Sequence, residues 1–179
     1  MSILKVSRLG HPVLREQSRN VSAAALASPA IQTLIDNMVE TMVEYYGVGL
    51  AAPQVHESLS LAVIESRGAR GQIPLTVLVN PHLTVLDENR IEDWEGCLSI
   101  PDLRGRVPRF SKLRVDALDR HGKPLQITAE GFFARVIQHE FDHLMGSVYL
   151  DRMPDLRSLS YFGEFQRFWL PEEEEQPEK

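Results

Sequence analysis

The sequence predicts an α+β fold: small, mostly antiparallel sheets around a central helix, with another helix near the N-terminus on the outside. Two long segments, near residues 29–46 and 132–145, are expected to be helices, and the first of them has the 3.6-residue spacing of apolar side chains that is typical of helices. Between them lie short apolar runs joined by tight turns, which favours antiparallel strands. The segment 132–145 is apolar on most of its circumference, as a helix at the centre of a protein usually is.

The first helix is expected from Pro29 to Tyr46. Ser28 can cap its N-terminus, Pro29 suits the first helical position, and Gly47 can close its C-terminus. Its apolar face consists of Ile31, Leu34, Ile35, Met38, Val39, Met42, Val43 and Tyr46. Because the helix is amphipathic, it should cover one side of a sheet.

The strand candidates are short. They are Leu59 to Glu65, Leu75 to Asn80, His82 to Leu86, Leu113 to Leu118 and Leu125 to Glu130. Pro81 is expected to end the second of them, and His121–Pro124 should form the turn before the last. Apolar residues alternate in Leu113 to Leu118, which predicts a strand with one solvated face.

The second helix is expected from Phe132 to Met145 and should end at Gly146. It contains no lysine, so the histidines on it should be shielded from water. The aromatic segment Leu156 to Leu170 should pack back on the protein, and the charged run 171–179 should be disordered. We therefore expect a single domain over residues 1–170, followed by an acidic tail.

The composition excludes several classes of protein. The chain has 179 residues, enough for one domain with a buried core, and 43% of them are hydrophobic. Its formal charge of −6 gives no reason to expect nucleic acid or a membrane as a partner, and no segment approaches the length of a membrane span. The N-terminus lacks a secretory signal, and a single cysteine cannot form an internal disulfide. A cytoplasmic location is therefore expected.

Residues 139–143 read His-Glu-Phe-Asp-His. On a helix, His139 and His143 project from one face and can bind one metal ion, while Glu140 is placed to move a proton to or from water. Such a site hydrolyses bonds when the metal keeps one position open. The alternative is a helix with two surface histidines, but the apolar surroundings favour buried imidazoles, which need partners. We therefore predict that the central helix binds a metal.

Cys97 is the only cysteine, and it has three interpretations. A lone cysteine is usually a small buried hydrophobe, and it can also be a nucleophile paired with one histidine. As a thiolate ligand it would complete a Cys-His-His set that leaves one position open for water. A nucleophile gives no reason for two histidines spaced one helical turn apart.

The segment Gly47–Gln54 reads Gly-Val-Gly-Leu-Ala-Ala-Pro-Gln. One interpretation is a helix C-cap followed by a turn. The other is a strand edge of small residues that a substrate backbone can approach, with the Gln54 amide directed at a carbonyl oxygen. The segment is not a phosphate-binding loop, because the Gly-Lys-Ser/Thr ending is absent.

Three motifs, in this order along the chain, resemble those of the peptide deformylase family. They are Gly47–Gln54, the Glu-Gly-Cys-Leu-Ser of Glu95–Ser99, and the Gln-His-Glu-Phe-Asp-His of Gln138–His143. Gly10–Arg15 also resembles the opening segment of that family, so the resemblance covers about residues 10–152. Three motifs with compatible spacing are far more specific than any one of them.

The resemblance implies that the formyl group is removed from the N-terminal formyl-methionine of new polypeptides, with release of formate. The implied ligands of a divalent metal are Cys97, His139 and His143. The metal is typically iron(II) in the family, with zinc or nickel as alternatives. Glu140 is then the general base, and the Gln54 amide and the Leu98 backbone N–H meet the developing oxyanion.

The resemblance also implies how a peptide is bound. The methionine pocket should be bordered by Val48, Phe132, Arg135, Val136 and His139. The peptide backbone should pair with Gly49 and Gly96 as an added strand, and Arg104 should lie at the mouth of the site. Glu95 should pair with Arg109. The implied partners are formyl-methionyl peptides and, as a candidate, the ribosome near its exit tunnel.

Two rival functions are left open by the sequence. The first is a zinc peptidase whose third ligand lies downstream, with Glu164 as the candidate. The second is a catalytically idle relative that only binds peptides. An idle protein would not need Glu140, Gln54 and Cys97 together.

Overall fold

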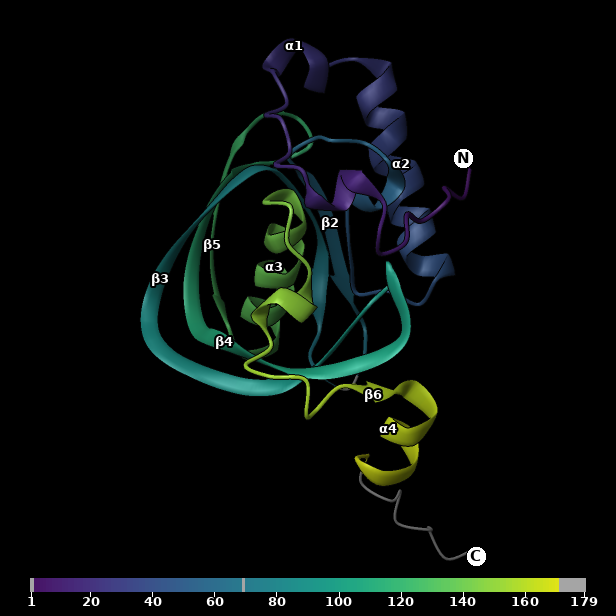
Figure 1. Ribbon diagram of the computed structural model, residues 1–179. Helices are drawn as coiled ribbons and strands as arrows, with labels where there is room; N and C mark the ends of the chain where they lie inside the picture. Colours follow the sequence, from purple (N-terminus) through teal and green to yellow (C-terminus); the bar gives the residue numbers. More distant parts are fainter. Residues whose placement is uncertain (1, 69, 171–179) are drawn as a thin grey trace, which may run out of the picture.

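The computed structural model describes residues 2–68 and 70–170 (Figure 1). Its helices are α1 (Ala23–Leu26), α2 (Pro29–Glu44), α3 (Gly131–Leu144) and α4 (Phe162–Phe168), with 3-10 turns η1 (Pro12–Arg15), η2 (Ala52–Val55) and η3 (Tyr149–Arg152). Its strands are β1 (Gly49–Ala51), β2 (Leu61–Ser66), β3 (Ile73–Cys97), β4 (Ile100–Leu118), β5 (Pro124–Glu130) and β6 (Ser160–Tyr161). The expected α+β class is confirmed, whereas the acidic tail 171–179 lies outside the described residues.

The strands form an antiparallel sheet that bends around α3. Five of them pair in the order β1-β2-β3-β4-β5, every pair antiparallel, and β6 pairs with β4. Figure 1 shows β3 and β4 curving around α3, so that the helix lies on the concave side. This confirms the expectation of antiparallel strands around a central helix, although β1 to β5 form one continuous sheet rather than several small ones.

The boundary expected at Pro81 is wrong. Leu75–Asn80 and His82–Leu86 both belong to β3, which runs through the proline. The pairing register with β4 shifts at this point, and Asn80 has a left-handed φ of 50°. Pro81 therefore lies in a bulge, where its missing N–H removes no bond from the ladder.

Residues 87–112 were not expected to be strands, yet they form a long ribbon of β3 and β4. Trp94 pairs with Arg106 within it, and the strand expected at Leu113–Leu118 is only the last part of β4. Residues 87–92 are exposed and mostly charged, so they show no apolar alternation. Their pairing is set by the partner strand rather than by a buried face.

Helix α2 begins where the sequence predicts. The backbone N–H of Ile31 donates to Ser28 Oγ (N···O distance 3.4 Å), and Pro29 is the first helical residue. At the other end Gly47 closes the helix by donating to the Met42 carbonyl at 2.8 Å, but the left-handed residue is Tyr46, with a φ of 55°. The helix covers β1 and β2, and the buried core there includes Ile35, Met38, Met42, Leu50, Leu61 and Val63.

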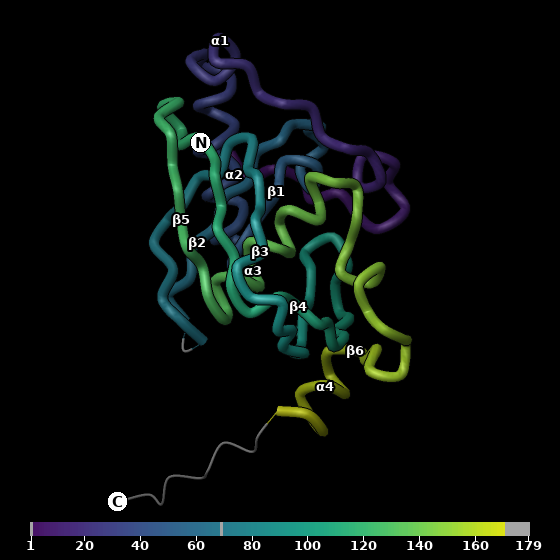
Figure 2. The backbone as a smooth tube through the Cα atoms, turned by 90° about the vertical axis from the view of Figure 1, so that its left-hand side faces the viewer, coloured from purple at the N-terminus to yellow at the C-terminus, as the bar shows by residue number. Residues whose placement is uncertain are grey.

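Helix α3 is central, as expected. Its residues Ala134 and Ile137 belong to one buried core with Ile64, Leu78, Leu113, Val115 and Ala129 of the strands. Gly146 follows the helix with a φ of 74°, and a Cβ there would lie 2.8 Å from the backbone of Arg15, so this position requires glycine. The views in Figures 1 and 2 place α1 and α4 at opposite ends of the molecule. No helix within the described ranges has the length and apolarity needed to span a membrane.

The segment 156–170 packs back on the protein, as expected. Strand β6 pairs with Leu103 and Arg104 of β4. Phe165 of α4 is buried against Trp94 of β3, with 4.9 Å between the ring centroids. The C-terminal helix is therefore fixed to the same ribbon that carries Cys97.

Candidate metal centre and substrate cleft

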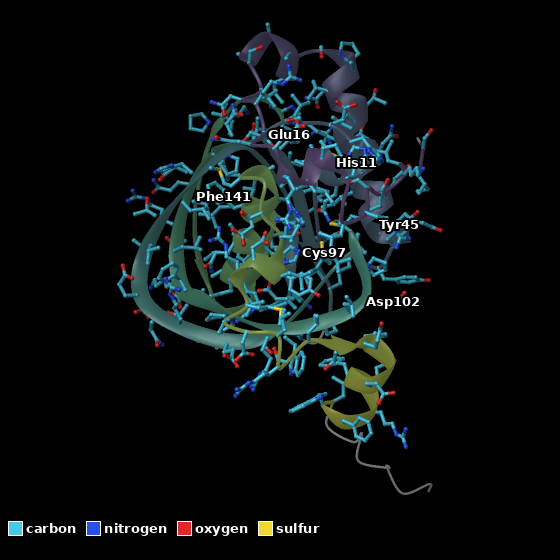
Figure 3. All side chains as sticks on the ribbon, viewed as in Figure 1. His11, Glu16, Tyr45, Cys97, Asp102 and Phe141 are labelled. Carbon is cyan, nitrogen blue, oxygen red and sulfur yellow. The ribbon has the colours of Figure 1, made fainter. Side chains whose placement is uncertain are left out.

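A cleft of about 700 Å³ opens between α3, β1 and the β3–β4 ribbon. The lining residues that the sequence singled out are Val48, Gly49, Glu95, Gly96, Cys97, Leu98, Arg104, Phe132, Arg135, Val136, His139 and Glu140. Figure 3 shows Cys97, the last residue of β3, beside α3. The structure therefore brings together segments that lie far apart in the sequence.

Cys97, His139 and His143 meet at the floor of this cleft. One ligand atom from each of the three lies within 4.8 Å of the others, and Cys97 Sγ is 3.2 Å from His143 Nε2. Burial alone would raise the pKa of the Cys97 thiol, but the neighbouring His143 and His139 outweigh it and hold this pKa well below its ordinary value. The sulfur is therefore disposed to be a thiolate, which is the form that binds metals.

Glu95 orients the ring of His139. Its Oε2 lies 2.9 Å from His139 Nδ1, which leaves Nε2 of that ring as the remaining ring nitrogen. Arg109 donates from Nε and Nη2 to the two Glu95 oxygens, at 2.9 and 3.0 Å, so the expected pair is present. Burial alone would raise the pKa of Glu95, but the hydrogen bonds from His139 and Arg109 hold it well below its usual range. Glu95 is therefore an ionised partner that fixes the tautomer of His139.

Arg135 lines the cleft, but its charged end is used inside the protein. Its Nη1 donates to Glu95 Oε1 and to the Val107 carbonyl oxygen, each at 2.8 Å. The Arg135 side chain is only 7% exposed. What it offers to the cleft is therefore the side of a fixed arginine, with no free guanidinium.

Asp142 is a member of the site that the sequence analysis missed. It lies inside the His-Glu-x-x-His segment, accepts from Arg109 Nη1 at 2.6 Å, and binds Arg152 of η3 at 2.7 Å. A chain of charged contacts thus runs from Arg152 through Asp142, Arg109 and Glu95 to His139. The sequence did carry a signal for this residue: an aspartate between two histidines of a buried helix needs hydrogen-bond partners.

The carboxylate of Glu140 is buried beside the cleft. Its Oε2 has no hydrogen-bond partner among the described residues. The carboxylate packs against Gly49 so closely that a Cβ at that position would collide with it. Burial raises the pKa of Glu140 to about 7. A carboxyl group with such a pKa can both take up and release a proton near neutral pH.

Gln54 is not part of the cleft lining but lies behind Cys97. Its Oε1 accepts from the Ala51 N–H at 2.9 Å, which fixes the orientation of the amide. Its Nε2 faces the sulfur of Cys97 at 3.5 Å and the hydroxyl of Ser99 at 3.2 Å. Its donor end is therefore directed toward the sulfur, beside the floor of the cleft.

Two further residues near the centre were missed. Tyr149 of η3 is buried and lies parallel to the His139 ring, with 6.2 Å between the centroids and 19° between the planes. Phe162, the first residue of α4, lines the cleft, and the guanidinium carbon of Arg104 lies 4.5 Å from its ring centroid. No motif pointed to either residue. Tyr149 lies in η3, shortly after α3, and Phe162 reaches the site through the packing of the C-terminal segment.

The donor set fits a divalent metal. One thiolate and two imidazoles suit transition metals and would leave room for a fourth ligand. The three donors are buried together, and the partnerless oxygen of Glu140 lies beside them. By contrast, Glu164 is exposed on α4 and is not part of any cluster of metal donors among the described residues. The peptidase alternative therefore lacks its third ligand.

Known proteins are similar to this chain in both sequence and fold. The family model described as polypeptide deformylase matches residues 3–158. The chain is similar to peptide deformylase 1 of Nitrosomonas europaea, with 42% identity over 164 residues, covering 89% of this chain and 92% of the relative. It is also similar to a crystal structure of class I type b peptide deformylase from Acinetobacter baumannii, at 37% identity and a TM-score of 0.83, covering 86% of this chain and 100% of that chain. Another structure of the Acinetobacter protein, with Met-Ala-Ser bound, is 36% identical with a TM-score of 0.82, covering 85% and 99%.

Proposed function

The chain belongs to the peptide deformylase family, and we propose that it hydrolyses the formyl amide of formyl-methionyl peptides. Proteins of this family are metal-dependent hydrolases that remove the N-formyl group from nascent peptides. In the proposed reaction, water cleaves the amide bond to give formate and a peptide with a free methionine amine. The observation that carries the proposal is the convergence of Cys97, His139 and His143 beside the buried carboxylate of Glu140.

The proposed metal ligands are Cys97 through its sulfur and the two histidines through ring nitrogens. We propose iron(II) as the metal in the cell, because it is typical of the family. Zinc and nickel are alternatives, since a thiolate with two imidazoles accepts all three. When bound, the metal supplies a Lewis acid that lowers the pKa of water and polarises a carbonyl oxygen. Glu95 keeps His139 in the orientation that directs Nε2 toward that ion.

Glu140 is the proposed general base. It takes a proton from the attacking water and then returns it to the departing amine nitrogen. Its burial and its raised pKa support this role, because a carboxyl group that titrates near neutral pH is suited to both transfers. The collision that a Cβ on Gly49 would make with the carboxylate explains why glycine is needed there.

The oxyanion that forms on the formyl group is proposed to accept hydrogen bonds from Gln54 and from the backbone of Leu98. The Gln54 amide nitrogen already faces Cys97, so a carbonyl oxygen placed beside the sulfur is within its reach. Gly49 and Gly96 lie on the two walls of the cleft and are the proposed partners of the peptide backbone, which would add as a strand. Arg104 lines the cleft, and we propose that it lies at the mouth and meets the carboxyl side of the peptide.

Formate release from formyl-Met-Ala-Ser by anaerobically purified protein, with metal content measured in parallel, tests this function. We expect formate and one equivalent of Met-Ala-Ser for each bond cleaved. Cys97→Ser should lose the metal and the activity, whereas Glu164→Ala should keep both. Retention of metal by Cys97→Ser with loss in Glu164→Ala would support the peptidase instead.

We also propose that the protein acts in the cytoplasm, where formylated chains are made. A contact with the ribosome near its exit tunnel stays a prediction. Co-sedimentation of the full chain with ribosomes would test it.

A further inference from the structure

Helix α3 forms one long side of the substrate cleft. Phe132, Arg135, Val136 and His139 all line it, with the spacing of residues that share one helical face. Seven residues separate Phe132 from the proposed metal ligand His139, which corresponds to about 10 Å along the helix axis. The cleft therefore has a reactive end at His139 and a far end at Phe132.

The far end is covered by a loop between β2 and β3. The guanidinium carbon of Arg70 lies 4.5 Å from the centroid of the Phe132 ring, and Arg70 itself lines the cleft. A Cβ on Gly71 would lie 3.8 Å from Phe132 Cδ1, so two successive residues of the loop lie against this ring. The loop is tied to the end of β2, because Ser66 Oγ donates to the Gly71 carbonyl at 2.7 Å.

Arg70 is also fixed from the β3 side. It forms an ion pair with Asp93, and the two side chains are 51% and 41% exposed. A second cavity of about 240 Å³ lies beyond this point, and Arg70, Phe132 and Arg135 border both cavities. These three residues are therefore the partition between the substrate cleft and the second cavity. Since Arg135 is fixed by Glu95, Arg70 is the exposed part of the partition.

We propose that Arg70, held by Asp93, is a specificity-determining residue that closes the far end of the methionine pocket and limits the length of the side chain accepted there. The proposal rests on the proposed function and deepens it. An unbranched side chain such as methionine extends from the reactive end along α3. A longer side chain would have to displace the guanidinium from Phe132 and Asp93. Without Arg70, it would continue toward the second cavity.

The test compares formyl-Met-Ala-Ser with the same peptide carrying 2-aminooctanoic acid, whose unbranched side chain is longer, in place of methionine. The quantity measured is the ratio of kcat/KM for the long peptide to that for the methionine peptide, using metal-loaded full-length protein. We expect Arg70→Ala to raise this ratio about tenfold or more, because each methylene accommodated in an apolar pocket changes kcat/KM by about tenfold or more. Asp93→Asn should raise it less, about threefold, since a half-exposed ion pair holds Arg70 only weakly.

Two variants serve as controls. Arg67→Ala removes a neighbouring arginine that is 87% exposed, pairs with Glu65 and is absent from the cleft lining, so it should leave the ratio unchanged. Arg70→Lys keeps a cation that can lie over Phe132 and should keep the ratio close to that of the parent. A ratio in Arg70→Ala within twofold of the parent, or an equal rise in Arg67→Ala, would overturn the proposal.

The same comparison separates this inference from the proposed function. If the parent protein releases no formate from either peptide, the proposed function fails. The pocket is then tested by binding of the two deformylated tripeptides, measured calorimetrically. Arg70→Ala should shift the ratio of their dissociation constants toward the longer peptide, and an unchanged ratio would overturn the assignment of Arg70.

Discussion

The charged groups behind the metal centre and those on the exposed surface of the β3–β4 ribbon are organised differently. Behind the centre, the side chains of Glu95, Arg109 and Asp142 are only 4 to 7% exposed, and each has two or more charged partners. On the ribbon surface, Arg106 pairs with Glu92 at 3.3 Å, and both side chains are 45% exposed. The first group is a buried network, whereas the second consists of single exposed pairs.

This difference indicates which part of the molecule fixes geometry and which part is open to change. A buried ion that loses its partner is strongly destabilising, because its desolvation is no longer compensated. An exposed pair contributes little, since water and salt already screen it. We therefore expect the buried network to hold His139 in place, and the exposed pairs to tolerate substitution.

The largest contrast should appear in the free energy of unfolding. Arg109 and Arg106 lie on the same strand, β4, and both form ion pairs. Arg109→Met removes a charged partner from both Glu95 and Asp142, so we expect the free energy of unfolding to decrease by about 3–5 kcal/mol. Arg106→Met should lower it by about 1 kcal/mol or less. Urea unfolding of the two variants measures both values, and equal losses would contradict the division into a buried network and exposed pairs.

The next contrast concerns metal affinity. Glu95→Gln keeps the shape of the side chain but removes the negative charge beside His139, so we expect the dissociation constant of the metal to rise about 10- to 100-fold. Asp93→Asn, two residues earlier on β3, should leave it unchanged because Asp93 contacts none of the proposed ligands. Competition with a chromophoric chelator measures the affinity of both variants. An unchanged constant in Glu95→Gln would show that His139 does not depend on this contact.

A smaller effect is expected in the pH dependence of stability. The pKa of Glu95 is lower in the folded protein than in the unfolded chain, where it is near 4.5. Its contribution to stability is therefore fully present above about pH 4.5 and is lost as the pH falls toward the folded-state pKa. The difference in unfolding free energy between the parent and Glu95→Gln isolates this contribution, and it should shrink on acidification. A difference that stays constant into acid would contradict the lowered pKa.

The parts of the fold that were predicted from the sequence are those with a strong local signal. The start of α2 followed from Ser28 and Pro29, and the central position of α3 followed from its apolar circumference. The ribbon of residues 87–112 was missed because its exposed charged residues carry no alternation. The strand boundary expected at Pro81 was wrong because the proline lies in a bulge, where no backbone N–H is needed for pairing.

The candidate site divides in the same way. The convergence of Cys97 with the two histidines was predicted from the resemblance of the three motifs to the family, together with the helical spacing of His139 and His143. The orientation of Arg135 was not, since the guanidinium is directed by Glu95, which lies on a distant strand. The position of Arg70 was not predicted, because nothing in its local sequence indicates that this side chain lies over Phe132.

The central claim is that the Cys-His-His set holds the metal while Glu140 performs the proton transfers. Measuring formate release and metal content together in Glu140→Ala tests it most directly. We expect this variant to keep about one metal per chain and to release formate about 10²- to 10⁴-fold more slowly than the parent. Hydrolysis of formyl-Met-Ala-Ser at the parental rate by the metal-loaded variant would contradict it.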